Sequence, residues 1–97
     1  MHEVTVHRLD TDPSVTLTFQ PLDAKGNPAP PAGPVTWTGS DGTIGEIQLP
    51  QPRNPCLVSI LGKVGTDDIT ATDGVATVLV HLVIDGSVET DATVIAS

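Results

Sequence analysis

The sequence predicts an all-β fold, an antiparallel β-sandwich of seven to eight strands. Its 97 residues include thirteen Thr and twelve Val, and β-branched side chains favour extended backbone over helix. Nine Gly and nine Pro leave little uninterrupted chain for helices. Short alternating runs bounded by turn residues recur at intervals of roughly 8–12 residues, which is typical of sandwiches and small barrels.

The size and composition indicate one domain, spanning residues 1–97. A chain of 10.0 kDa buries enough surface for one core between two layers. The single cysteine, Cys56, cannot close an intrachain disulfide, so packing must hold the core. The longest apolar stretch, residues 78–84, is too short to span a bilayer, and no secretory signal is evident.

The first two predicted strands are residues 3–7 and 14–20, separated by a turn at 10–13. In the first, Val4 and Val6 share one face, which suits an edge strand. The second alternates strictly between apolar residues and Ser or Thr, so one face is expected in the core. Its core-facing residues are Val15, Leu17 and Phe19.

Residues 23–34 contain four prolines and two glycines, which predicts a loop without a regular ladder. Residues 28–31 are expected in polyproline geometry. Prolines hold a loop in one shape and reduce the entropy lost on docking. The loop therefore supplies candidate partner-binding residues, Pro28, Pro30 and Pro31, although a plain inter-strand connection is the alternative interpretation.

A hairpin is predicted next, from residues 35–38 to residues 44–49, with Val35 and Trp37 facing the core. Four further strands are expected in the second half of the chain, one of which places Ile69 in the core. They comprise residues 56–61, 68–72, 75–84 and a closing strand at 88–95, the last three joined by Asp-Gly turns at 73–74 and 85–86.

Two segments resemble the bacterial immunoglobulin-like domains. Residues 35–42, Val-Thr-Trp-Thr-Gly-Ser-Asp-Gly, are similar to the family's V-x-W-x-S-x-D segment, with Gly39 where Ser is usual. Residues 65–72, Gly-Thr-Asp-Asp-Ile-Thr-Ala-Thr, are similar to its G-T-x-x-I-T-A segment. The resemblance implies an immunoglobulin-like sandwich that displays or adheres, as on bacterial surface proteins and on the virions of tailed bacteriophages.

The resemblance, together with the absence of an evident export signal, predicts a non-enzymatic decoration or accessory protein on a bacteriophage capsid or tail. Such a protein is made in the host cytoplasm and sits on the virion surface. Its expected partner is the major capsid protein or another virion protein, with homo-oligomers on the lattice. The alternative is an adhesin or carbohydrate-binding module from a larger bacterial cell-surface protein, with a host-surface glycan as ligand.

Composition and residue spacing argue against nucleic-acid binding, metal binding and catalysis. The net charge of −8 repels nucleic acid, and no histidine pair has zinc-ligand spacing. The acidic turns lack the calcium-loop pattern, and no serine lies in a nucleophile elbow. We therefore expect no catalytic, cofactor-binding or metal-binding residue. Cys56 is expected to be buried and inert, and His81 to be partly buried with one ring nitrogen bonded to the backbone.

The candidate docking segments are therefore the first strand with Val4 and Val6, the proline-rich loop, and the C-terminal tail. Their composition predicts that these segments are exposed.

Overall fold

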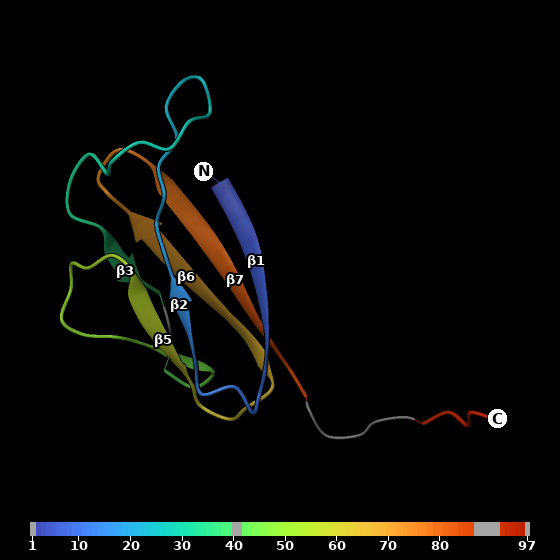
Figure 1. Ribbon diagram of the computed structural model, residues 1–97. Helices are drawn as coiled ribbons and strands as arrows, with labels where there is room; N and C mark the ends of the chain where they lie inside the picture. Colours follow the sequence, from blue (N-terminus) through green and yellow to red (C-terminus); the bar gives the residue numbers. More distant parts are fainter. Residues whose placement is uncertain (1, 40–41, 87–91, 97) are drawn as a thin grey trace.

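The computed structural model describes residues 2–39, 42–86 and 92–96, and within these it contains seven strands and no helix (Figure 1). The expected all-β class is thereby confirmed. The strands are β1 (His2–Leu9), β2 (Ser14–Leu17), β3 (Thr36–Thr38), β4 (Gly45–Ile47), β5 (Cys56–Ile60), β6 (Gly65–Thr72) and β7 (Thr77–Asp85).

The strands form two sheets, ordered β1-β7-β6-β3 and β2-β5-β4, whose inner faces enclose the core. With the strands lettered in chain order from A to G, the orders β2-β5-β4 and β3-β6-β7 are the B-E-D and C-F-G orders of the immunoglobulin fold. The molecule is a two-sheet β-sandwich.

One sheet is mixed, which corrects the expectation of purely antiparallel pairing. β1 pairs with β7 in parallel, from His2 opposite Val78 to Leu9 opposite Asp85. After β1 the chain crosses to the other sheet to form β2, so β1 and β7 are not joined by a hairpin. A parallel pair requires such a crossover, whereas a tight turn imposes antiparallel pairing.

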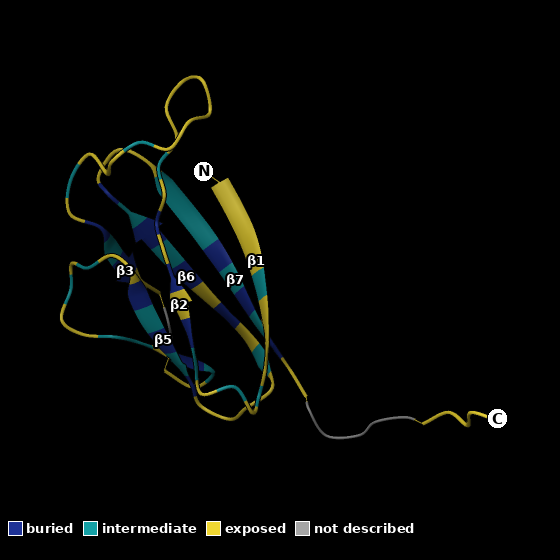
Figure 2. Cartoon of the chain, in the orientation of Figure 1, coloured by how far each residue is buried: buried dark blue, intermediate teal, exposed yellow. Residues whose placement is uncertain are grey.

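The core is built by alternation along the longer strands, whose inward residues are buried (Figure 2). Trp37 is opposite Ala71 on β6, and the small alanine leaves room for the indole. All six expected core residues are buried: Val15, Leu17, Phe19, Val35, Trp37 and Ile69. Cys56 is also buried.

The expected hairpin between residues 35–38 and 44–49 is wrong. β3 pairs with β6, whereas β4 pairs with β5 in the other sheet. Residues 39–44 separate these strands, a connection longer than the two to five residues of most hairpins. Gly39 begins that connection with φ of 100°. A glycine at position 39 is thus required by the backbone, where the family pattern usually has Ser.

The end of the chain also differs from expectation. The expected strand at 75–84 is present as β7, Thr77–Asp85, which is the last strand among the described residues. Part of the expected closing strand, residues 88–91, lies outside the described residues. The described part, residues 92–96, is not in a strand, and Val94 and Ile95 are 92% and 90% exposed.

The outer face of the mixed sheet carries an ion pair network around His81. Its Nδ1 lies 2.8 Å from Asp68 Oδ1 and its Nε2 lies 3.7 Å from Glu3 Oε1. The hydrogen bond to Asp68 is the main cause that raises the pKa of His81 above its ordinary 6.5. The expected backbone partner was therefore wrong, because the β6–β7 register places Asp68 directly opposite His81.

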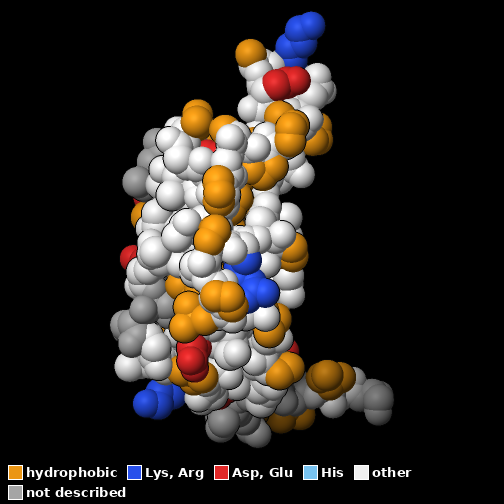
Figure 3. All heavy atoms as spheres, turned by 90° about the vertical axis from the view of Figure 1, so that its left-hand side faces the viewer, with side chains coloured by type: hydrophobic (Ala, Val, Ile, Leu, Met, Phe, Trp, Pro, Cys, Tyr) orange, Lys and Arg blue, Asp and Glu red, His pale blue; other side chains and the backbone are white. Residues whose placement is uncertain are grey.

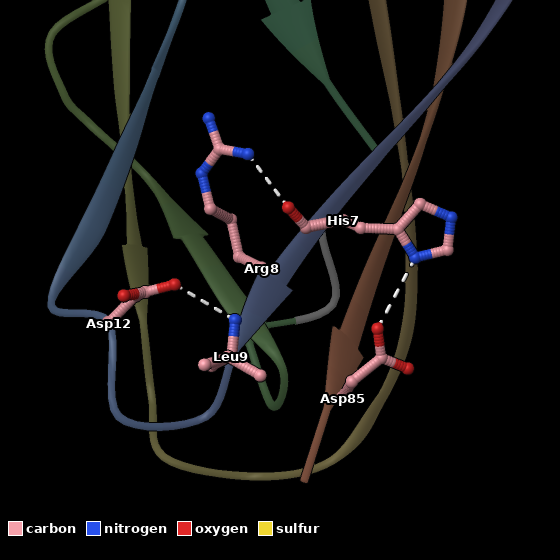
Figure 4. A network of polar contacts seen from close by, with 5 residues as sticks. All are labelled: His7, Arg8, Leu9, Asp12 and Asp85. Carbon is pink, nitrogen blue, oxygen red and sulfur yellow. Dashed lines mark hydrogen bonds and ion pairs between the residues drawn. The ribbon is translucent and has the colours of Figure 1, made fainter. Parts of the chain in front are cut away.

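At the end of β1 that contains Leu9, three contacts hold the strand and the following turn (Figure 4). His7 Nδ1 lies 3.3 Å from Asp85 Oδ2, and the Leu9 amide donates to Asp12 Oδ2 at 2.9 Å. Arg8 Nη1 donates to the His7 carbonyl at 2.7 Å. These contacts fix the end of the sandwich from which the chain leaves after β7.

Candidate functional site

A shallow hollow lies between the two proline-containing loops, and we call it the proline hollow. It encloses about 390 Å³ and is lined by Pro31, Gly33, Pro34 and Val35 on one side and by Pro52, Arg53 and Asn54 on the other. Figure 3 views the side of the molecule that bears these loops, where hydrophobic side chains surround a group of Lys or Arg atoms. A cation in a largely apolar hollow can pair with a carboxylate and pack against apolar groups.

The second loop of the hollow is held to the sandwich by its own backbone and by side-chain amides. The Arg53 amide donates to the Val35 carbonyl at 2.8 Å, and the Trp37 indole donates to the Arg53 carbonyl at 2.7 Å. Gln51 Oε1 accepts from the Trp37 amide at 3.0 Å. Asn54 accepts from the Phe19 amide and donates to the Phe19 carbonyl, both at 2.9 Å.

These contacts explain where β2 ends. The expected strand ran to residue 20, but β2 ends at Leu17, and Phe19 is paired by the Asn54 side chain instead of by a strand. An asparagine side chain offers one donor and one acceptor, as a backbone unit does. The proline hollow is therefore tied to the core at Phe19 and Trp37.

The first loop is anchored by Asp73, which is only 7% exposed in the turn between β6 and β7. Asp73 Oδ2 accepts from the Ala32 amide at 2.9 Å, and Oδ1 accepts from the Val75 and Ala76 amides. These donors, that of Ala76 first, hold the pKa of the carboxyl below its ordinary 3.8. The ionised Asp73 thus joins the proline-rich loop to the turn.

The guanidinium of Arg53 is only partly used by the chain. Its Nη1 contacts the Pro50 carbonyl at 3.5 Å, at the limit of a hydrogen bond. Within the described residues, its Nε is buried without a hydrogen-bond partner. A guanidinium has five N–H donors, four of them on the terminal Nη atoms, and these Nη donors retain capacity for an incoming acceptor. Sequence reasoning assigned no binding role to Arg53, because its place beside the proline-rich loop depends on long-range pairing.

The structure divides the predicted partner-binding residues among three places. Pro31 lines the proline hollow, and the exposed Pro30 precedes it. Pro28 pairs with Leu22 in an isolated bridge at the base of a projecting loop, and no strand is assigned in residues 23–34, as expected. Asp23 closes that loop by accepting from the amides of residues 25 and 27, which gives it a local hairpin form.

Val4 and Val6 line a separate groove between β1 and β2, which we call the edge groove. It encloses about 290 Å³, and its floor includes Phe19, Trp37 and Val80. A neighbouring hollow of about 210 Å³ shares His2, Phe19, Gln20 and Val78 with it. The two hollows form a continuous, mostly apolar groove along one open side of the sandwich.

Within the described ranges, no group of three or more His, Cys, Asp or Glu side chains is placed to hold a metal ion. The same residues contain no helix long and apolar enough to cross a bilayer. No protein-family model, curated protein or solved structure matches the chain.

Proposed function

We propose that this protein is a non-enzymatic binding and display module, a member of the bacterial immunoglobulin-like domains that decorates a bacteriophage capsid or tail. The observation that carries the binding role is the proline hollow, an apolar surface tied to the core and lined by Arg53, whose Nη1 lies at the limit of a hydrogen bond, 3.5 Å from the Pro50 carbonyl. The virion assignment rests on the sequence resemblance.

The proposed mechanism is docking by surface complementarity. Pro31, Pro34 and Pro52 present a surface with little conformational freedom, so little entropy is lost when a partner packs against it. Arg53 pairs with a carboxylate of the partner, which we propose to be the major capsid protein or another virion protein. Many copies on a repeated lattice give durable coverage from weak single contacts.

The first test replaces Pro30 and Pro31 by Gly and measures the number of copies bound per purified particle over a concentration series. We expect the dissociation constant to rise about tenfold, because the more flexible loop must be ordered on docking. Ala24→Gly, in the projecting loop, is the matched control and should bind normally. The melting temperature is measured in parallel to show that each variant is folded.

Arg53→Ala tests the charged contact in the same assay. The backbone bonds of residue 53 to Val35 and Trp37 are retained, so the fold should persist while particle binding falls about tenfold or more. Unchanged occupancy for both the proline and the arginine variants would overturn the assignment of this surface. Binding of the unaltered protein to glycans instead of particles would support the adhesin alternative.

A further inference from the structure

The three-strand sheet has an open edge at β2. β2 pairs only with β5, because the sheet is ordered β2-β5-β4. In constant-type immunoglobulin domains the first strand fills the place beside the second. Here β1 pairs with β7 in the other sheet, so no strand from the described part of the chain lies in that place beside β2.

The edge groove runs beside this open edge. Leu17 from β2 and Thr18 after it line the groove on one side, and Val4 and Val6 from β1 line it on the other. None of the residues that line the groove or its neighbouring hollow is Asp, Glu, Lys or Arg. An apolar strand could therefore pair along β2 and bury side chains in the groove without burying a charge.

The chain itself contains a segment of this chemistry. Residues 92–96, Ala-Thr-Val-Ile-Ala, carry no charged side chain, although the whole chain has a net charge of −8. Val94 and Ile95 are 92% and 90% exposed, the highest values among the large exposed hydrophobic residues. Figure 1 shows the segment lying away from both sheets. β-branched residues of this kind favour a strand once a partner edge is present.

We propose that residues 92–96 of one copy add as a strand to the β2 edge of a second copy, with Val94 or Ile95 in its edge groove. β7 ends opposite Leu9, whereas the groove extends to His2 at the other end of β1. The segment thus leaves its own sandwich at the end remote from His2. Reciprocal exchange produces a two-fold dimer in which each copy donates one strand and accepts one.

The test is sedimentation equilibrium of the full 97-residue chain over a wide concentration range, together with two variants. The unaltered chain should shift from 10.0 kDa towards twice that mass as the concentration rises. The donor variant, Val94→Ser with Ile95→Ser, should raise the dimer dissociation constant at least about 100-fold. Val64→Ser with Val75→Ser changes two other exposed valines, 60% and 82% exposed, and should leave it unchanged.

The acceptor variant, Thr18→Lys, places a charge in the edge groove at an exposed position, and its folding is checked by circular dichroism. Each variant alone should be monomeric, whereas an equimolar mixture should form mixed dimers through the intact segment of one chain and the intact groove of the other. A monomer at all concentrations, or a dimer insensitive to the donor variant, would overturn the proposal. So would a monomer whose residues 92–96 are protected from hydrogen exchange, since the segment would then occupy its own groove.

Discussion

At Gly39 the backbone leaves the mixed sheet with φ of 100°, a value that residues with a Cβ adopt only under strain. A Cβ at this position would lie 3.0 Å from the carbonyl oxygen of Asp68, tighter than ordinary contact. The start of the connection from β3 to β4 therefore requires glycine at position 39.

Gly39→Ser restores the residue usual in the resembled family, and we expect it to lower the free energy of unfolding by about 1–2 kcal/mol or more. Gly86→Ser is the matched control, because a Cβ there would meet Val64 at an ordinary 3.6 Å. Urea unfolding, monitored by Trp37 fluorescence, measures the free energy of unfolding of both variants. Equal stability of Gly39→Ser and the unaltered protein would contradict the assigned backbone strain.

His81 should make stability dependent on pH. Its pKa in the folded protein is raised above 6.5, so its contribution is fully present below pH 6.5 and is lost as the pH rises through the raised value. We therefore expect a melting temperature that falls over this interval. Asp68→Asn removes the main cause of the raised pKa and should flatten the profile.

Glu46→Gln is the control for this profile, because it also removes one exposed carboxylate but lies on β4, in the other sheet. It should preserve the pH dependence. An NMR titration of His81 provides the direct measurement, and a folded-state pKa at or below 6.5 would contradict the assignment.

At the scale of elements, side-chain amides of the proline-containing loop 49–55 make the backbone hydrogen bonds that a neighbouring strand would otherwise make. Asn54→Ala removes both hydrogen bonds to Phe19, and we expect it to lower the free energy of unfolding by about 1–3 kcal/mol. Asn27→Ala in the projecting loop should change it by less than about 0.5 kcal/mol. If the two substitutions lower the free energy of unfolding equally, Asn54 does not act as a substitute for a strand partner.

Alternation was sufficient to predict most strands from the sequence. Val15 and Leu17 alternate with polar residues and lie inward on β2, and Ile69 lies inward on β6. The pairing of strands was harder to predict, because β3 and β4 are adjacent in sequence yet lie in different sheets. Local pattern determines which face of a strand is buried, whereas long-range packing determines which strands pair.

The candidate site was less predictable than the strands, for the same reason. The density of prolines indicated a docking loop and identified Pro31, which lines the proline hollow. Arg53 is 22 positions further along and joins Pro31 only because its amide bonds to Val35. A closing strand was expected because the alternation in residues 92–95 is typical of a strand, but the described residues 92–96 are not in a strand.

At the scale of the whole molecule, a small sandwich presents two different surfaces. The proline hollow combines apolar area with a guanidinium, and the edge groove is apolar and lined without charged side chains. We propose that the first docks on a virion protein and that the second accepts a strand from another copy. A protein with both contacts would cover a lattice as linked pairs, which adds avidity to each docking event.

The virion assignment is tested most directly by intact-mass spectrometry of particles and cell fractions from the natural source. We predict a chain of 10.0 kDa that sediments with virions in many copies per particle. Finding this sequence only within a larger chain bound to the bacterial envelope would contradict the proposal and assign the domain to a surface adhesin.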